Sequence, residues 1–175
     1  RIKLWTFAPE LAGQRKFAEA AFAYDIALSV GHSEATAETI FSYVPYGLKV
    51  GCHCTNASGV TPSPSAYAGT REVGVDEAVL VHDDIYAEII PDAGGLHVRP
   101  LMCKLIHKTK GTNRVIIISD AMDETGATPS CAASAVGEAP PQANLDADVN
   151  FVPGIGLFGS RLTMNQAVRN MMRHA

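Results

Sequence analysis

Several absences narrow what this chain can be. Its 4 cysteines include no Cys-x-x-Cys pair, which argues against a zinc ribbon and against a disulfide framework. No apolar run reaches the roughly 20 residues needed to span a bilayer. Lys and Arg together number 14 against 18 Asp and Glu, and the net charge of −4 offers no basic surface for nucleic acid. We therefore expect a cytoplasmic protein that binds neither a membrane nor nucleic acid.

What the chain does have is the composition of one globular domain, 47% hydrophobic and 18% charged over 175 residues. Strand-like apolar runs alternate with amphipathic segments, which predicts an α/β fold with a parallel sheet. Strands are expected at 2–7, 26–30, 48–53, 85–90 and 114–119, and helices at 11–24, 36–46, 76–82 and 100–108. A last helix is expected after Thr163 as N-cap, with an apolar stripe of Met164, Ala167, Val168, Met171 and Met172 in the core.

Two stretches break this alternation. Residues 55–74 are rich in Pro, Ser, Gly and Thr, and a loop of this length indicates function rather than simple connection. Residues 124–150 are rich in Ala, Pro and Ser without periodicity, so they are expected to be irregular. Three histidines lie outside any motif and are expected at the surface: His82, His107 and His174.

Four segments each end in a polar residue capable of catalysis: His32, His53, His97 and Asp120. In a (β/α)-barrel the C-terminal ends of the strands carry the chemistry. Three histidines and one aspartate at such ends predict a metal ion that activates water. Because a closed eight-stranded barrel takes about 250 residues, we expect the chain to be an internal piece of a longer protein.

Three of these residues also have a plainer interpretation. A histidine that follows a strand can cap it through hydrogen bonds, which is the alternative for His32 and His53. An aspartate that follows a strand is a good helix N-cap, which is the alternative for Asp120.

Seven short motifs follow one another along nearly the whole chain: TFAPE at 6–10, SVGHSEAT at 29–36, HCTNA at 53–57, TREVG at 70–74, GLHV at 95–98, SDA at 119–121 and GSRLTM at 159–164. In this order they resemble the N-acetylglucosamine-6-phosphate deacetylases of the amidohydrolase superfamily. The resemblance implies a partial TIM-type (β/α) barrel made of strands 4–8, with residues 1–175 as one partial catalytic domain. The first strand, a further glutamate ligand and a flanking β-domain would lie outside this sequence. Glu10 belongs to a different motif and is not assigned to the metal.

The resemblance also implies roles for individual residues. His32 and His53 would be metal ligands, and imidazole suits zinc or ferrous iron, as one or two ions. Asp120 would be the general acid and base. The substrate-binding residues would be His97 at the sugar and the carbonyl, Asn56 and the Ala57 backbone at the phosphate or the sugar, and Arg71 at the phosphate. Leu157, Phe158 and Gly159 would line the acetyl group.

Arg71 is expected to bind the phosphate, because a guanidinium offers paired hydrogen-bond donors that match phosphate oxygens. In the family the equivalent arginine can act across a dimer interface, so the resemblance implies a homodimer. An ordinary solvated surface arginine is the alternative.

The expected function is therefore a metal-dependent hydrolase that deacetylates N-acetylglucosamine 6-phosphate to glucosamine 6-phosphate and acetate. One alternative is another amidohydrolase with a different N-acyl substrate. The other is a non-catalytic, truncated barrel segment without a complete metal site.

Overall fold

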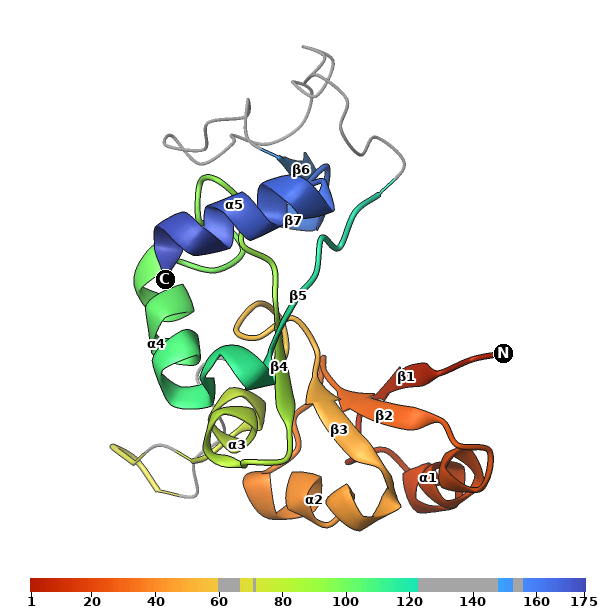
Figure 1. Cartoon of the computed structure of the whole chain (residues 1–175). Coiled ribbons are helices and arrows are strands. Elements are labelled where there is room, and N and C mark those ends of the chain that lie inside the picture. Colours follow the sequence, from red (N-terminus) through yellow and green to blue (C-terminus); the bar gives the residue numbers. More distant parts are fainter. Residues whose placement is uncertain (60–66, 71, 123–147, 153–155) are drawn as a thin grey trace. The chain divides into compact units, whose positions relative to one another are not determined.

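The computed structural model describes residues 1–59, 67–70, 72–122, 148–152 and 156–175 (Figure 1). These residues form two compact units. The first consists of Arg1–Ile89 and Ile106–Ile116, and the second of Ile90–Leu105 and Ile117–Ala175. Among the described residues no helix has both the length and the apolar character needed to cross a membrane.

The chain builds a five-stranded sheet whose order follows the sequence: β1 (Leu4–Phe7), β2 (Ala27–Val30), β3 (Leu48–Gly51), β4 (Tyr86–Ile89) and β5 (Val115–Ile117). The pairs β1–β2, β2–β3 and β3–β4 are parallel. The helices between the strands are α1 (Gln14–Ala23), α2 (Ala37–Phe41), α3 (Val75–Val81) and α4 (Pro100–Lys110). The predicted α/β fold with a parallel sheet is confirmed.

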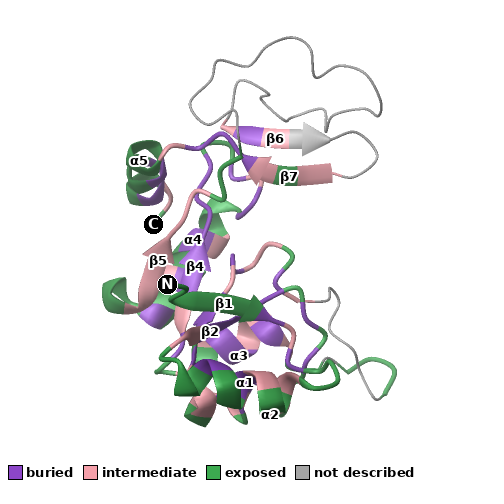
Figure 2. Ribbon diagram, turned by 90° about the vertical axis from the view of Figure 1, so that its right-hand side faces the viewer, coloured by how far each residue is buried: buried purple, intermediate pink, exposed green. Residues whose placement is uncertain are grey.

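The sheet is buried unevenly. Leu28 and Val30 of β2 are fully buried, as are Ala87 and Ile89 of β4, as expected of parallel strands covered by helices. In β1 the first three residues are exposed, and Leu4 and Trp5 keep 41% and 45% of their surface (Figure 2). An exposed apolar strand at the edge of a sheet is a surface suited to pairing with another strand.

The helix expected at residues 36–46 is shorter in the structure. α2 ends at Phe41, and a separate 3₁₀ turn, η1, spans Val44–Tyr46. Pro45 explains the break, because it has no N–H to donate to the carbonyl of Phe41, four residues earlier, and its ring clashes with that carbonyl in an α-helix. The start of the helix is as predicted, since the Thr36 side chain accepts a hydrogen bond from the Thr39 N–H.

The second unit contains a hairpin that the sequence pattern does not predict. Strands β6 (Val149–Val152) and β7 (Gly156–Ser160) pair antiparallel. The expectation of an irregular segment to residue 150 is therefore wrong at its end, while 124–147 lies outside the described residues. Both strands are short, and β7 contains two glycines and no apolar alternation, so the periodicity that predicts a strand is absent.

Helix α5 (Met164–His174) begins after Thr163, as predicted, and the Gln166 side chain accepts a hydrogen bond from the Thr163 N–H at 3.2 Å. Ala167 packs in a core with Ile90 and Leu162. The expected core stripe is only partly right. Ala167 and Met171 are buried with Asn170, whereas Met164, Val168 and Met172 are exposed.

Candidate active site

In the first unit, His32 and His53 each lie two residues beyond a strand, β2 and β3 respectively. Both have left-handed backbone conformations, with φ of 51° and 28°. Such conformations are uncommon for residues other than glycine and cluster at functional sites. They turn the two side chains toward each other, and the Nε2 atoms lie 3.0 Å apart.

The His53 ring is held by its other nitrogen, because Nδ1 makes a short hydrogen bond with the carbonyl oxygen of Asn56. A carbonyl only accepts, so Nδ1 carries the proton and Nε2 of the neutral ring presents a lone pair toward His32. This is the arrangement that orients metal-ligating histidines.

The spacing of the two nitrogens fits a shared metal ion. Zinc–nitrogen bonds are about 2.0–2.1 Å long, so two nitrogens at the tetrahedral angle lie about 3.3–3.4 Å apart, a few tenths of an ångström more than the 3.0 Å between these two atoms. Within the described part of the chain, no group of three His, Cys, Asp or Glu residues could hold an ion. Since zinc sites use at least three protein ligands, His32 and His53 fit as one half of a site that needs further ligands.

The loop that follows His32 is anchored by Glu10. Its carboxylate accepts hydrogen bonds from the Ser33 hydroxyl at 2.7 Å and from the Glu34 N–H at 2.8 Å. Hydrogen bonds to a carboxylate are stronger than those between neutral groups. Glu10 is not predicted to bind the metal, and in the structure its contacts hold the backbone next to His32.

We expect Glu10→Ala to weaken zinc binding by the chain about 10-fold, because losing a group that orients a metal ligand costs 10–100-fold in affinity. Competition with a zinc indicator measures the effect. The control is Glu19→Ala, which removes an exposed carboxylate on α1. Equal zinc affinities for the two variants would show that Glu10 does not support His32.

The residues proposed for the phosphate are only partly described. Asn56 donates its N–H to the His53 carbonyl at 2.8 Å, so its backbone shapes the turn that holds His53. Ala57 is exposed and left-handed, with φ of 46°. Arg71 lies outside the described residues.

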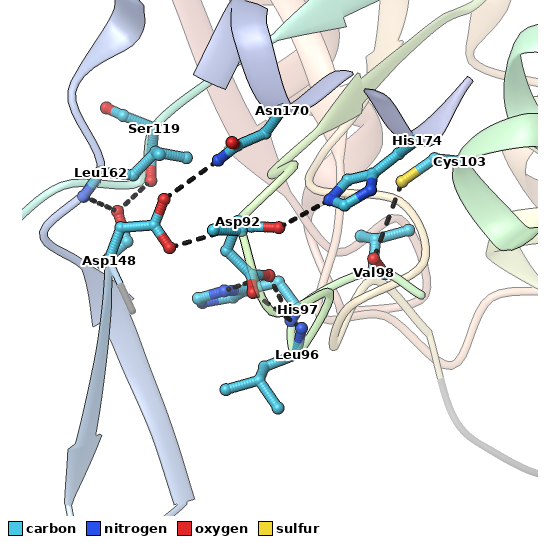
Figure 3. Close-up of polar contacts among 12 residues, drawn as sticks. Asp92, Leu96, His97, Val98, Cys103, Ser119, Asp148, Leu162, Asn170 and His174 are labelled. Carbon is cyan, nitrogen blue, oxygen red and sulfur yellow. Dashed lines mark hydrogen bonds and ion pairs between the residues drawn. The ribbon is translucent and has the colours of Figure 1, made fainter. Parts of the chain in front are cut away.

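In the second unit, His97 is paired with Asp92, which the sequence analysis did not name (Figure 3). The Asp92 carboxylate accepts hydrogen bonds from the N–H groups of Leu96 and His97, each at 2.8 Å, and contacts Nδ1 of His97 at 3.3 Å. The two side chains are 0% and 1% exposed, and Nε2 of His97 has no hydrogen-bond partner among the described residues. One ring nitrogen of His97 is therefore held by Asp92, and the other is buried without a hydrogen-bond partner among the described residues.

Burial acts to raise the pKa of Asp92, but the hydrogen bonds from the His97 ring and from the Leu96 and His97 amides outweigh it, and the pKa is lowered. The ionised carboxylate thus stabilises the folded chain above the pKa that Asp92 has when unfolded. This stabilisation is lost as the pH falls through the lowered pKa of the folded state.

We therefore expect the thermal unfolding midpoint to fall in acid partly through Asp92. Asp92→Asn should be less stable than the unsubstituted chain at neutral pH, with a difference that shrinks as the pH falls. Scans at a series of pH values check this, with the exposed Asp84→Asn as control. A difference independent of pH would contradict the assignment.

Asp120 is exposed and has a left-handed backbone, with φ of 50°. Its carbonyl accepts the Ser160 N–H at 2.7 Å, and Ala121 forms a β-bridge with Ser160. Because Ala121 is in a bridge, Asp120 does not cap a helix, and that alternative is wrong.

The β7 segment proposed to line the acetyl pocket lies beside Asp120. A Cβ on Gly159, whose φ is 63°, would lie 2.9 Å from the Asp120 carbonyl oxygen and 2.6 Å from Cγ of Met122, so only glycine fits without movement. Leu157 is half-buried and Phe158 is 50% exposed. The structure thus brings together His32 with His53, and Asp120 with Gly159, each pair within its own unit.

Two relatives show what the chain resembles. It is 32% identical over 178 residues to the N-acetylglucosamine-6-phosphate deacetylase of Lysinibacillus sphaericus, a match that covers 98% of this chain and 41% of that protein. It is 29% identical over 125 residues to the N-acetylgalactosamine-6-phosphate deacetylase of a Shewanella species, covering 71% of this chain and 29% of the relative. No protein-family model matches.

Solved structures show a similarity to the same kind of deacetylase. The N-acetylglucosamine-6-phosphate deacetylase of Thermotoga maritima superposes with a TM-score of 0.78 at 28% identity, covering 99% of this chain and 44% of that one. A mutant of the Mycobacterium smegmatis deacetylase, in complex with N-acetyl-D-glucosamine-6-phosphate, superposes with a TM-score of 0.71 at 26% identity. The match covers 98% of this chain and 42% of that one. This chain spans about two-fifths of the length of these proteins.

Proposed function

We propose that this chain is part of a metal-dependent hydrolase that deacetylates N-acetylglucosamine 6-phosphate to glucosamine 6-phosphate and acetate. The observation that carries the proposal is the His32–His53 pair, with its Nε2 atoms 3.0 Å apart beyond two adjacent parallel strands. The similarity to N-acetylglucosamine-6-phosphate deacetylases over 98% of the chain supplies the substrate.

The proposed fold is a partial (β/α) barrel, in which the five strands are strands 4–8 and residues 1–175 are part of one catalytic domain. Parallel strands in sequence order, separated by helices, support it. The exposed edge of β1 also supports it, because a further strand would pair there. A cytoplasmic location and a homodimer belong to the same proposal.

His32 and His53 would hold zinc or ferrous iron together with ligands from outside this sequence. The chemistry supplied by such an ion is activation of water and polarisation of a carbonyl oxygen. Asp120 accepts the proton of the attacking water and delivers it to the nitrogen of the leaving amine as the C–N bond breaks. The exposure of Asp120 leaves its carboxylate accessible for this transfer.

The other residues bind and orient the substrate. Asn56, the Ala57 backbone and Arg71 hold the phosphate, and Arg71 serves across the dimer interface. The segment Leu157–Gly159 lines the acetyl group. His97 contacts the sugar and the carbonyl through Nε2, which has no hydrogen-bond partner among the described residues. In the neutral ring this atom accepts from a sugar hydroxyl, and in the protonated ring it donates to the carbonyl oxygen.

The test is acetate release from N-acetylglucosamine 6-phosphate by the chain loaded with zinc and, separately, with ferrous iron. Release that depends on the metal supports the proposal. No release by folded protein overturns it for this chain and favours the non-catalytic alternative, and a stoichiometric ion retained through dialysis would speak against that alternative.

Substrate choice is tested by competing substrates. Phosphorylated N-acetylglucosamine should be preferred over the unphosphorylated sugar, because Asn56 and Arg71 are assigned to the phosphate. N-acetylgalactosamine 6-phosphate belongs in the same comparison, since one relative carries that name. Equal rates with and without phosphate would favour an amidohydrolase with a different N-acyl substrate.

A further inference from the structure

The loop that carries His97 is held by helix α5 at two points (Figure 3). Nε2 of His174 lies 2.9 Å from the carbonyl oxygen of Asp92, to which it donates. Asn170 donates to one oxygen of the Asp148 carboxylate at 3.1 Å, and the other oxygen accepts the Ala93 N–H at 3.0 Å. The backbone is thus fixed on both sides of the peptide bond between Asp92 and Ala93.

Two polar side chains of α5 that make these contacts, His174 and Asn170, are more buried than the sequence pattern suggests. His174 is half-buried and hydrogen-bonded, as are His82 and His107, so none of the three is the fully exposed histidine that the sequence predicts. Asn170 is 4% exposed, between the buried Ala167 and Met171. Burial of an amide costs free energy unless it is hydrogen-bonded, and here the bond to Asp148 meets that requirement.

The fixed loop in turn determines the state of His97. Oδ1 of Asp92 accepts the Leu96 N–H, and Oδ2 accepts the His97 N–H and faces Nδ1. Both oxygens are occupied by donors, so the carboxylate cannot rotate without losing a bond. An ionised carboxylate only accepts, and therefore Nδ1 of His97 must carry a proton.

The proton on Nδ1 determines whether Nε2 of His97 accepts or donates a hydrogen bond. In the neutral ring this atom is an acceptor, suited to a sugar hydroxyl, and in the protonated ring, paired with Asp92, it is a donor. In the opposite tautomer the neutral ring would present a donor there and would repel the same hydroxyl proton. The tautomer thus decides which substrate atom His97 can bind.

We propose that Asp92 is a positioning residue that sets the tautomer and orientation of His97, and that α5 holds Asp92 in place through Asn170 and His174. The inference rests on the proposed function in that His97 is taken to contact the sugar. The Asp92–His97 geometry itself does not depend on it.

The test uses the full chain with ¹⁵N-labelled histidine. The ¹⁵N shifts of His97 report its tautomer, and the expected form in the unsubstituted chain has the proton on Nδ1. Asp92→Ala should move the population toward the Nε2–H form, and His174→Ala should do so to a smaller extent. With N-acetylglucosamine 6-phosphate, His174→Ala should raise KM about 5- to 10-fold and leave kcat within about 2-fold, as expected when binding that is equally strong in the ground state and the transition state is lost.

Matched variants separate positioning from general stability. His174→Gln places an amide donor near the position of Nε2 and should retain the tautomer and KM of the unsubstituted chain. His174→Asn is polar but too short and should behave like His174→Ala, which also covers the case in which alanine prevents folding. Met172→Ala, on the same turn and 79% exposed, is the control.

The inference is overturned if His97 in the unsubstituted chain carries its proton on Nε2, or if the His174→Asn variant keeps both tautomer and KM. If the unsubstituted chain releases no acetate, the proposed function fails for this chain. The tautomer comparison between the Gln and Asn variants then still decides whether α5 positions His97.

Discussion

Replacing Asp120 by Asn should lower kcat for acetate release by about 10²- to 10⁴-fold, the range that general acid–base catalysis contributes. The amide keeps the size of the side chain but cannot take a proton from water and return it to the leaving amine. Its backbone contacts with Ser160 need only the carbonyl of residue 120, so the fold should be preserved. Acetate release under saturating substrate measures the effect.

The matched control for this prediction is Asp83→Asn, which removes another exposed carboxylate. It should retain the activity of the unsubstituted chain. Zinc affinity and substrate KM should be nearly unchanged in Asp120→Asn, because the residue is assigned to proton transfer and not to binding. Turnover of this variant near the unsubstituted rate would remove Asp120 from the mechanism.

The second large effect is expected at the histidine pair. His53→Ala should weaken zinc binding by at least about 100-fold, because losing an outer-shell partner alone already costs 10–100-fold and this change removes a ligand itself. His32→Ala should give a loss of similar size. The measurement is competition between the chain and a zinc indicator.

A histidine outside the pair provides the control. His107→Ala removes an imidazole from α4, where it lies 3.3 Å from the Thr112 hydroxyl, and should not change zinc affinity. If His32→Ala and His53→Ala bind zinc as tightly as His107→Ala, the two histidines cap their strands and hold no ion. The double variant adds a further check, since two ligands of one ion should show strongly non-additive effects.

How much of the site was predictable differs from residue to residue. His32, His53 and Asp120 follow apolar runs that are visible in the sequence, and their places beyond β2, β3 and β5 agree with the expected strands. Asp92 was missed because an aspartate in a Gly-rich loop looks like an ordinary turn residue. Its burial, and its bonds to the His97 ring, depend on the folded loop.

The amino-acid sequence by itself determined the alternation of strands and helices, the N-cap at Thr163 and the polar residues that end the strands. These follow from local preferences, since the periodicity of apolar residues and capping act over a few neighbouring positions. The same locality explains why Pro45, a single residue, ends one predicted helix early.

Only the tertiary structure decided which side chains meet. The approach of His32 and His53, the Glu10 anchor, and the contacts that link the loop of Asp92 to His174 directly and to Asn170 through Asp148 join positions that are distant in sequence. Such contacts depend on strand register and on left-handed turns at single residues, which leave little trace in the pattern of apolar and polar residues. For this reason the sequence names the candidate groups, and the fold decides their partners.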